Sequence, residues 1–486
     1  MRRSSWRLVV FVLALAASGR AADVPVAGAV LDLRASATKP ARRSARLVLR
    51  DAAIAAPLPD PRADGATLVL HGGAAAGQCW VHVALPAAGW RAVGRPSPKV
   101  GYRFRDPRRP RDVVGVQLRP GRVQVTARGA AFPCDLSAAQ RVPVTATLRV
   151  GTTRWCGAFG GRVGRNGPGR LVAKAAPAPA ACPDADVTAA SLNVLHGIAC
   201  PGDDLCRFAD RVDLWLAHLV AAGCPDVVAL QEILFDSVPV IDARLPGPCG
   251  YQRVYEKTNA VDDAMLLTRV PVVTSSVTKL RGGFRNLLFV RLDHPLGPLD
   301  VFVTHLASDS DGATAPCGDG CPAECVAAGA TVRRDCQSVQ VAALVGRLHT
   351  VATPALVAGD FNESPGSFVY RQMTDPGWID TYLAAGHPEC VPATGVGCTS
   401  GRVDDDLSQM ESRATNESER IDFVFAVPPT AGSCTVDGAG DADGDGARTG
   451  LFADAPNPFA PACGPAPAPI CWPSDHVGTQ VDIDCR

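Results

Sequence analysis

The sequence predicts a chain of two parts, an all-β domain followed by an α/β domain. Residues 23–175 contain short β-like runs broken by Gly and Pro, with little helical periodicity. After residue 186, strand-like runs alternate with helix-like runs, which is typical of an α/β fold. The length of 486 residues agrees with two domains, because a single domain usually has about 100–200 residues.

The N-terminus has the three regions of a signal peptide. A basic start, Met1-Arg2-Arg3, precedes an uncharged apolar run from Leu8 to Ala17, and Ser18-Gly19-Arg20-Ala21 follows as the cleavage region. We expect residues 1–21 to be removed and the protein to be secreted or periplasmic; a retained anchor is the alternative. The apolar run is too short for a permanent bilayer span, and no later run is long enough, so we expect no transmembrane segment in the mature chain.

All 18 cysteines lie after this segment, and an even number in an exported chain predicts disulfides. Three close pairs can close small loops: Cys200 and Cys206, Cys390 and Cys398, and Cys463 and Cys471. The run Cys317, Cys321, Cys325 and Cys336 has the ligand types of a zinc site. An oxidising compartment removes the thiolates that zinc needs, so disulfides that staple a surface insertion are the better interpretation.

The first domain, residues 23–175, is predicted to be a β-sandwich or barrel of unknown function. Its clearest strand-like runs are 66–70, 79–83, 121–126 and 144–150. It shows no catalytic constellation, and His71 and His82 are interpreted as structural or surface residues. Residues 176–185, rich in Ala and Pro, are predicted to be a semi-rigid linker.

The formal net charge of zero conceals an uneven distribution. Residues 23–180 hold 25 Lys and Arg against 8 Asp and Glu, a net charge of +17, whereas residues 181–486 hold 19 against 40, a net charge of −21. This division indicates two units that either face each other or have different partners. The basic domain is a candidate for contact with a polyanion or with the cell envelope.

The second part shows a clear order of elements. Phe208, Val212, Trp215 and Leu219 predict one amphipathic helix, and Val332, Cys336, Val339 and Ala343 predict another. The predicted strands are 187–194, 227–230, 287–292, 299–306, 355–358, 421–427 and 479–483.

Polar residues stand at the ends of these strands. They are Asn193, Glu232, His305, Asp360, Asn362, Asp422, Asp475 and His476. Because α/β folds gather strand ends at one edge of a sheet, we expect these side chains to meet there. Carboxylates and amides suit a hard divalent cation, and two histidines suit proton transfer. No G-x-S-x-G nucleophile motif is present.

The strings LNVLHG, LQE, THL, GDFN, RIDF and SDH occur in this order between residues 192 and 476. The series resembles the endonuclease/exonuclease/phosphatase superfamily, the deoxyribonuclease I-like proteins, over residues 186–486. The resemblance implies a four-layered sandwich in which two packed β-sheets are flanked by helices. It also implies that this domain is catalytic, with its site at the sheet edges.

The resemblance assigns roles to the strand-end residues. Glu232 resembles the principal metal-binding carboxylate, with Asn193 beside it and Asp475 near this metal or a second one. His476 resembles the general base, oriented by Asp422, and His305 the general acid.

Asp360 and Asn362 would position the attacking water and the phosphate. Arg285 is the candidate phosphate-binding arginine, with Arg281 and Arg269 as rivals. The strand at 261–269 departs from the family pattern at its leading polar position, so Asp263 is an open candidate for substrate contact. The remaining histidines of this part are left as structural or surface residues: His196, His218, His349 and His387.

A second candidate metal site is the segment Asp441-Ala442-Asp443-Gly444-Asp445-Gly446. Asp441, Asp443 and Asp445 occupy positions 1, 3 and 5 of a calcium loop, and Gly446 occupies position 6. Position 12 is Phe452, which cannot supply the bidentate carboxylate, although Asp454 lies near. Structural Ca²⁺ and a flexible acidic loop both remain open.

Together these features predict a secreted hydrolase that uses Mg²⁺ or Mn²⁺ to cleave phosphoester bonds by attack of water. A phosphodiesterase acting on nucleic acid, a nuclease, is the leading expectation. The alternatives are a sphingomyelinase-like phospholipid phosphodiesterase, a phosphomonoesterase, and a non-catalytic binding protein on the same fold.

Overall fold

The computed structural model describes residues 22–485 apart from a set of short segments. These are 36–41, 73–78, 95–100, 106–113, 130–133, 135, 141, 152, 181, 183–186, 260, 283, 295–296, 319, 350–352, 403–406, 416, 430–433, 437 and 439–447. The expected signal peptide, residues 1–21, and the expected calcium loop with Asp441, Asp443 and Asp445 lie outside the described residues.

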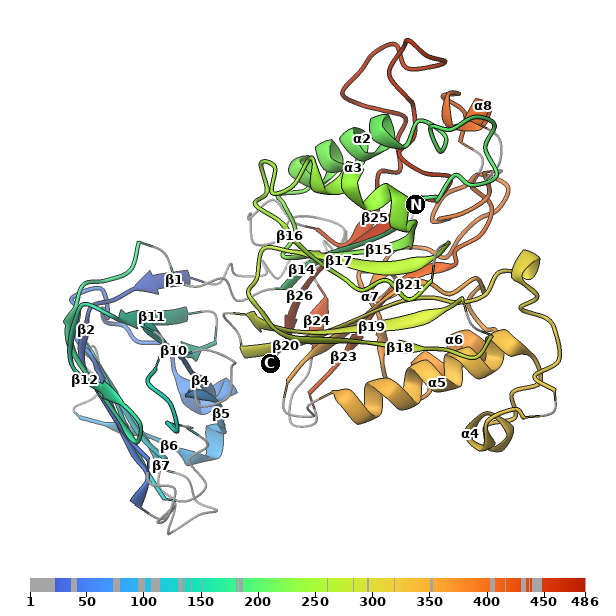
Figure 1. The fold of residues 1–486 in the computed structure, drawn as a ribbon. Coiled ribbons are helices and arrows are strands. Elements are labelled where there is room, and N and C mark those ends of the chain that lie inside the picture. The colour runs from blue at the N-terminus through green and yellow to red at the C-terminus, as the bar shows by residue number, and fades with distance from the viewer. Residues whose placement is uncertain are drawn as a thin grey trace, which may run out of the picture.

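The N-terminal domain consists of two packed sheets (Figure 1). The five-stranded sheet has the order β1 (Ala22–Pro25), β11 (Thr153–Phe159), β10 (Val144–Val150), β4 (Ala66–His71) and β5 (Trp80–Leu85). The eight-stranded sheet has the order β12 (Arg162–Gly167), β13 (Arg170–Ala176), β2 (Gly28–Arg34), β3 (Ser44–Leu49), β9 (Arg122–Arg128), β8 (Val114–Arg119), β7 (Gly101–Arg105) and β6 (Trp90–Val93). Helix α1 (Pro61–Asp64) and the 3₁₀ turn η2 (Ala87–Gly89) connect strands.

Alternating side chains explain why these segments form a sandwich. In β10 every second residue is buried, from Val144 through Ala146 and Leu148 to Val150, which is the period of a strand with one face on a core. The inward side chains of both sheets form one apolar core. Strand β13 continues to Ala176, so the first residue of the predicted linker 176–185 belongs to the strand.

The C-terminal domain also contains two packed sheets. The first has the order β16 (Gln252–Tyr255), β17 (Asp263–Thr268), β15 (Val227–Ile233), β14 (Val187–Asn193), β26 (Gly478–Cys485) and β24 (Cys434–Val436), with β25 (Gly450–Phe452) beside β26. The second has the order β18 (Val272–Lys279), β19 (Asn286–His294), β20 (Gly297–His305), β21 (Ala355–Asp360), β23 (Asp422–Val427) and β22 (Ile379–Asp380). Apolar side chains from both sheets form a core between them.

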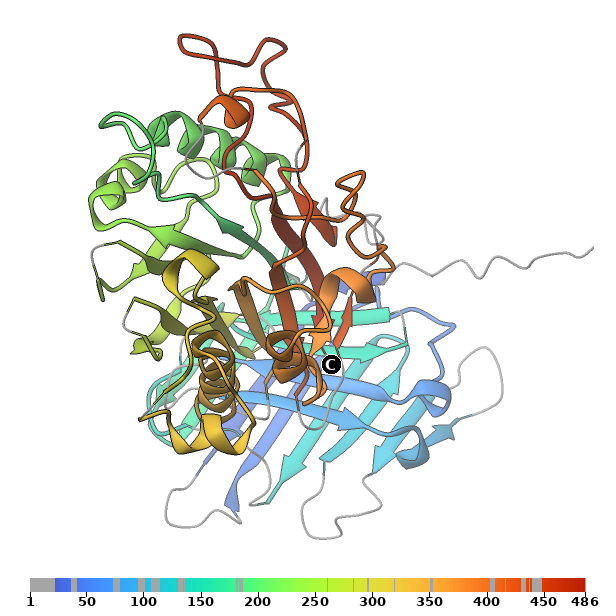
Figure 2. The same ribbon diagram turned by 90° about the vertical axis from the view of Figure 1, so that its right-hand side faces the viewer.

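Helices cover the outer faces of both sheets (Figures 1 and 2). Helix α2 (Phe208–Ala221) packs on the first sheet through Phe208, Val212, Trp215 and Leu219, the residues that predicted it. Helix α5 (Arg333–Leu348) packs on the second sheet. The shorter helical elements are α3 (Val238–Asp242), α4 (Ala323–Ala327), α6 (Phe368–Thr374), α7 (Thr381–Ala384), α8 (Leu407–Met410), η3 (Phe235–Ser237) and η4 (Asp309–Asp311). The four-layered sandwich is therefore confirmed.

The cysteines are paired in disulfides. The pairs are Cys79–Cys134, Cys156–Cys182, Cys200–Cys206, Cys224–Cys249, Cys317–Cys321, Cys325–Cys336, Cys390–Cys398 and Cys463–Cys471. The three short loops predicted from spacing are confirmed, and the four-cysteine run forms two staples instead of a thiolate zinc site. Within the described part of the chain, no cysteine is free.

The two domains touch at the start of β20. The His71 side chain, at the end of β4, lies 3.0 Å from Asp293 Oδ1 at the end of β19, and strand β5 contacts β20. His71 is thus a structural residue, as predicted. Among the described residues, no helix has both the length and the apolar character needed to cross a membrane.

Candidate active site

The predicted site residues meet at one edge of the C-terminal sandwich. Strands β14 and β15 are parallel, as are β20 and β21, so Asn193, Glu232, His305 and Asp360 lie at strand ends that point the same way. The antiparallel strand β23 begins at this edge with Asp422, which is in register with Asp360. Two sheets therefore contribute to one cluster.

Two residues of the cluster have backbone conformations that side chains rarely adopt. Glu232 has a φ of 61° at a bulge where the register between β15 and β17 shifts. Asn362, just after β21, has a φ of 52°. Left-handed conformations of residues other than glycine are costly and concentrate at functional sites. Here the bulge turns Glu232 out of the strand alternation and into the site.

A cavity of about 520 Å³ opens over this cluster. It is lined by His196, Glu232, Val261, Asp262, Phe284, Arg285, His305, Ser308, Ser310, Asp311, Asp360, Asn362, Ser400, Arg402, Ile421, Asp475 and His476. Seven of the predicted site residues are in this lining. Asn193 and Asp422 are fully buried behind it.

His476 is held by Asp422. Its Nδ1 lies 2.9 Å from Asp422 Oδ2, and its Nε2 lies 3.8 Å from Asp360 Oδ2. Burial opposes a charged imidazole, but Asp422, Asp475 and Asp360 outweigh burial and raise the pKa of His476 well above its usual value. The predicted pairing of His476 with Asp422 is therefore present in the geometry.

His305 has a different environment. Asn362 Nδ2 donates to His305 Nε2 at 2.9 Å, and Asp262 Oδ2 lies 3.0 Å from Nδ1. Arg285 Nη1 lies 2.6 Å from the same Nδ1 and can only donate, so this nitrogen contacts both a donor and an acceptor. Burial and the positive charge of Arg285 lower the pKa of His305 to about 4.

Glu232 and Asp475 supply buried negative charge. Glu232 accepts hydrogen bonds from Asn193 Nδ2 and from the His196 N–H, both at 2.9 Å. Although burial opposes its charge, His196, His305 and these hydrogen bonds lower the pKa of Glu232 to about 2. Burial and the charge of Glu232 raise the pKa of Asp475. Two buried carboxylates that repel each other are a donor set that a hard divalent cation can stabilise.

Asn193 adopts an orientation that differs from the metal-binding prediction. Its carbonyl oxygen accepts the N–H of Leu195 at 3.1 Å, so its amide nitrogen faces Glu232 and Asp360. In this orientation Asn193 bridges the two carboxylates as a donor and not as an oxygen ligand. The loop after β14 fixes this arrangement, because the buried Arg211 guanidinium on α2 donates to the carbonyls of Val194 and Leu195.

Asp360 connects the two histidines. It accepts the N–H of Asn362 at 2.8 Å, and its Oδ2 lies 3.4 Å from His305 Nε2. Burial and the charge of Asp422 raise the pKa of Asp360. Ligand atoms of Asp360, Asp422 and His476 lie within 4.8 Å of one another, so this second buried group can also hold a divalent cation.

The structure distinguishes the three candidate arginines. Arg285 lines the cavity and pairs with Asp262 and Asp311. Arg269 pairs with Asp226 outside the cavity lining, and Arg281 also lies outside it. Of these three candidates, Arg285 is the one in the cavity lining.

Ten residues of the lining were not predicted from the sequence, and three of them make contacts that shape the site. Asp262 pairs with both His305 and Arg285, whereas the candidate Asp263 is buried and accepts a hydrogen bond from Tyr255 Oη at 3.0 Å. Asp263 begins β17, is buried and does not line the cavity. Asp262 stands next to Asp263 in the sequence, and this adjacent carboxylate was the signal that could have identified it.

His196 and Arg402 are the other two. His196 was left as structural or surface but lines the cavity, and it already belongs to the LNVLHG string that marked Asn193. Arg402 stacks on Trp472, with its guanidinium 3.7 Å from the ring centroid, and its Nη1 donates to the Asp475 carbonyl at 3.4 Å. No sequence signal identified it.

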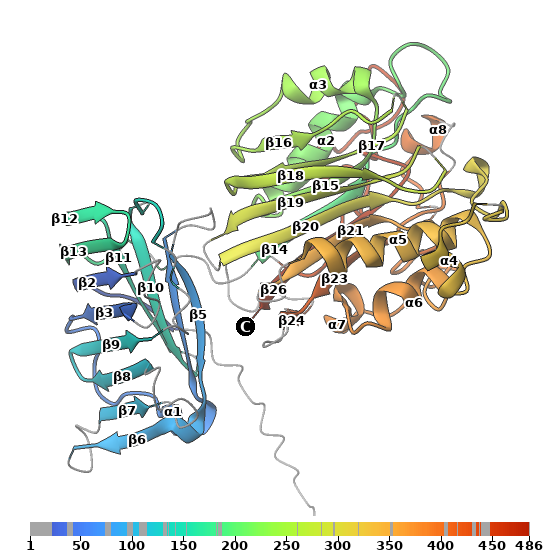
Figure 3. The same cartoon turned by 60° about the horizontal axis from the view of Figure 1, so that its bottom comes forward.

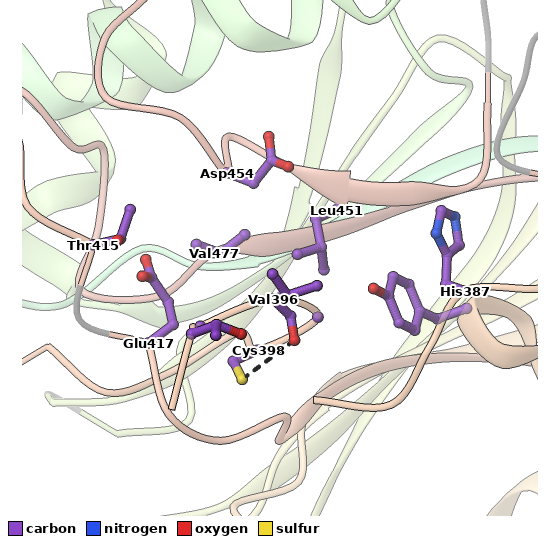
Figure 4. A pocket seen from close by; sticks show the side chains of 12 residues that line it. His387, Val396, Cys398, Thr415, Glu417, Leu451, Asp454 and Val477 are labelled. Atoms are coloured by element: carbon purple, nitrogen blue, oxygen red, sulfur yellow. Dashed lines mark hydrogen bonds between the residues drawn. The ribbon is translucent and has the colours of Figure 1, made fainter. Parts of the chain in front are cut away.

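A smaller cavity of about 310 Å³ lies beside the first and is shown in Figure 4. Arg402 lines the first cavity, and Glu417 lines the second. The ion pair between these two side chains separates the cavities. The histidine of this cavity, His387, has structural partners: its ring stacks on Tyr382, and its Nε2–H donates to the Thr449 carbonyl at 2.9 Å. This cavity lacks the paired histidines of the first, so the first is the candidate active site.

The sequence profile of the Endonuclease/Exonuclease/phosphatase family matches residues 190–476, which is more than half of the chain. This chain belongs to the endonuclease/exonuclease/phosphatase family. Members of this family hydrolyse phosphoester bonds, generally with a divalent metal ion. The match begins within β14 and ends at His476, just before the last strand, β26.

Solved structures of endonuclease/exonuclease/phosphatase proteins resemble the chain. TDP2 of D. rerio, humanised by 14 mutations, is 18% identical, with 62% of this chain and 99% of that chain covered and a TM-score of 0.43. TDP2 of C. elegans is 16% identical, with coverage of 62% and 75% and a TM-score of 0.39. A mannosyl-6-phosphatase of Bacteroides thetaiotaomicron is 17% identical, with coverage of 61% and 99% and a TM-score of 0.41. No curated protein matches the chain in sequence.

Proposed function

We propose that the protein is an exported phosphodiesterase that uses Mg²⁺ or Mn²⁺ and acts on nucleic acid. One observation carries the proposal. Two histidines, each paired with its own carboxylate, face the same cavity as the buried carboxylates Glu232 and Asp475. This arrangement combines a cation site with two groups for proton transfer, which hydrolysis of a phosphodiester requires.

Export is supported by the signal-like N-terminus and by the disulfides. Eight disulfides are described, and no described cysteine is free. Disulfides persist in oxidising compartments and are rare in the cytosol. Both features support a secreted or periplasmic location.

Glu232 and Asp475 are the residues that would hold the cation. A bound divalent cation stabilises the negative charge that develops on the phosphoryl oxygens. The protein's own part is to hold both carboxylates buried and to keep Glu232 charged: Asn193 and the His196 N–H donate to Glu232, and Ser474 Oγ lies 3.0 Å from Asp475 Oδ1.

Proton transfer is assigned to the two histidines. Asp422 fixes the His476 ring so that Nε2 faces the cavity, where it can accept a proton from an attacking water. His305, held by Asp262 and Asn362, would protonate the leaving oxygen. The pKa directions, raised at His476 and lowered at His305, are the reverse of this assignment. A cation at Asp475 would offset one of the charges that raise the pKa of His476. Kinetics on substrates with good and poor leaving groups test the assignment.

The rim of the cavity supports a substrate with bases. Phe284 is 58% exposed and lies next to Arg285 in the lining. An exposed aromatic ring can stack on a nucleobase, and the neighbouring guanidinium can contact a phosphate. The same apolar rim, Phe284 with Val261, also fits a lipid, which keeps the sphingomyelinase-like phospholipid phosphodiesterase as the second candidate.

Substrate assays separate these functions. Purified protein with Mg²⁺, Mn²⁺ or EDTA is given plasmid DNA, RNA, sphingomyelin, a chromogenic phosphodiester and a chromogenic phosphomonoester. We expect metal-dependent cleavage of nucleic acid and of the chromogenic diester, and a loss on nucleic acid in Phe284→Ala that the small diester does not show. Cleavage of sphingomyelin or of the monoester alone would replace the proposal with one of the alternatives. No cleavage of any substrate with either metal would favour a non-catalytic binding protein.

A further inference from the structure

The eight-stranded sheet of the N-terminal domain presents one face to the five-stranded sheet and the other to solvent. We define the basic face as the outward-pointing Lys and Arg side chains of this sheet. They are Arg34, Arg46, Arg91, Arg103, Arg105, Arg119, Arg122, Arg128, Arg162, Arg165, Arg170 and Lys174. All are exposed except Arg122 and Arg170, which are half-buried. Their inward neighbours, such as Leu33 and Ala127, are buried in the core.

Strand register places these charges in rows across the sheet. Lys174 is in register with Arg162, and Arg46 is in register with Thr126 and Asp32. Three cross-strand pairs consist of two arginines each: Arg91 and Arg103, Arg119 and Arg122, and Arg34 and Arg170. Like charges directly opposite each other destabilise a sheet, so this pattern has a cost to folding that an anionic partner relieves.

Little negative charge on the face offsets these rows. Among the described residues of these strands, the outward-pointing acidic residue is Asp32, which pairs with Arg34 and lies 3.5 Å from Arg170. Apart from the half-buried Arg122, the remaining arginines of the face are exposed. A concentrated positive field of this kind attracts a polyanion.

The basic face points away from the C-terminal domain. In Figure 3 the eight strands form the outer side of the N-terminal domain, and β5 and β10 lie between them and the C-terminal domain. The idea that the basic domain and the acidic domain turn their opposite charges toward each other does not apply to this face. The face is free to bind a separate partner.

We propose that the basic face binds double-stranded nucleic acid through its phosphates. At the usual strand spacing of about 4.8 Å, eight strands extend about 34 Å from first to last. One turn of B-form DNA also measures about 34 Å. The rows of basic side chains are therefore as long as one turn of a duplex and can contact phosphates along it.

The composition of the face favours a duplex over other polyanions. Val163 is the exposed large apolar residue of these strands. It is in register with the buried Ala173, so it belongs to the opposite face of the sheet. Membrane-surface binding usually adds apolar insertion, and binding of single strands uses aromatic stacking. The outward Val30 and Val172 are half-buried, Val48 is buried, and no described outward residue is aromatic, which leaves contact with a backbone of phosphates.

The face acts as an anchor and not as part of the active site. Strand β20 starts at Gly297, beside the contact between the domains, and ends at His305 in the candidate active site. Nine residues of strand extend about 30 Å, so the site lies at the far end of the C-terminal domain. A bound duplex would hold the enzyme near other segments of the polymer and raise their local concentration. This consequence for rate rests on the proposed function, whereas duplex binding does not.

Binding is measured by fluorescence anisotropy with a labelled 30-base-pair duplex in EDTA, so that no cleavage occurs. The face variant is Arg46→Gln/Arg103→Gln/Arg105→Gln in the full chain. The matched control, Arg244→Gln/Arg253→Gln/Arg371→Gln, changes the net charge equally on the C-terminal domain. We expect wild type and control to bind alike, and the face variant to bind at least ~10-fold more weakly at low salt. Its slope of log K against log salt should fall by up to about 2.7, which is 0.9 for each lost phosphate contact.

A second variant, Arg162→Gln/Arg165→Gln, tests the other end of the sheet, and thermal unfolding checks that both variants are folded. Wild-type affinity in both folded face variants would overturn the proposal. Binding to phosphatidylglycerol vesicles but not to the duplex would also overturn it and make the partner a membrane. Cleavage assays are independent: a protein that binds the duplex through this face but cleaves no nucleic acid would refute the proposed function and leave this inference in place.

Discussion

His476 Nδ1 lies 2.9 Å from Asp422 Oδ2, and this hydrogen bond joins the two sheets of the C-terminal domain at the candidate active site. Asp422 begins β23 in the second sheet, and His476 precedes β26 in the first. The orientation of the imidazole therefore depends on the packing of one sheet against the other. Without this contact, Asp422 would not orient the imidazole of His476.

The pairing predicts non-additive defects. His476→Ala and Asp422→Ala should each lower kcat on the order of 10²–10⁴-fold, the usual size of acid–base catalysis. The double variant should be little worse than His476→Ala alone, because both changes remove the same step. The measurement is kcat for the three variants on the chromogenic diester. Multiplication of the two defects would show that the residues act independently.

Glu232 is predicted to be the charged ligand of the cation. Glu232→Gln removes one negative charge with little change in shape, so affinity for Mg²⁺ or Mn²⁺ should fall at least ~10-fold, as for loss of key metal-site contacts. Calorimetric titration of the metal measures this without turnover. Glu324→Gln, an exposed change on α4, is the control and should bind as wild type. Full activity of the wild type in EDTA would contradict a metal requirement.

Asp262 is predicted to position His305. Asp262→Asn should weaken the contact with Nδ1 of His305 and reproduce part of the kinetic defect of His305→Ala. If His305 protonates the leaving oxygen, both variants should lose more on a substrate with a poor leaving group than on a nitrophenyl ester. Comparison of kcat on the two substrates is the measurement. Equal losses on both would remove His305 from the leaving-group side.

His218 predicts a pH dependence of stability. Burial on α2, with its ring against Phe452 and Phe459, lowers the pKa of His218 to about 4. An unfolded histidine, with its pKa near 6.5, binds a proton that the folded one does not, so stability is full above about pH 6.5. It falls as the pH decreases toward 4, by up to about 3 kcal/mol. Urea unfolding should show wild type losing stability relative to His218→Leu across this window; parallel curves would contradict the assignment.

The disulfides are predicted to stabilise the fold. Cys224→Ala/Cys249→Ala opens a loop with a sequence separation of 25, and the free energy of unfolding should fall by about 3 kcal/mol. Thermal or urea unfolding measures the change. Thiol titration of the denatured, unreduced protein should find few free thiols, and a large number would contradict an oxidised protein.

The sequence determined the local elements and most of the candidate site. Periodicity of apolar residues located α2, α5 and the central strands, because a buried helix face and a buried strand have different repeats. Polar residues after those strands identified Glu232, His305 and His476. Parallel neighbours bring such ends together, so the cluster followed from strand order.

Only the tertiary structure decided which of two adjacent residues faces the site. Asp262 and Asp263 differ by one position, and successive residues near a strand point to opposite sides, so register alone sends Asp263 inward. The same applies to Glu232, which a bulge turns toward the cavity, and to Arg402, which is brought in by a distant loop.

For the charge of the N-terminal domain, too, the sequence determined one part and the tertiary structure the other. Composition established that residues 23–180 are basic. The pairing of eight strands decided that arginines such as Arg91 and Arg103 stand opposite each other on one outward face. Composition gives only the number of charges. Alternation along each strand and register between strands decide which way the charged side chains point, and register depends on contacts between residues far apart in the chain.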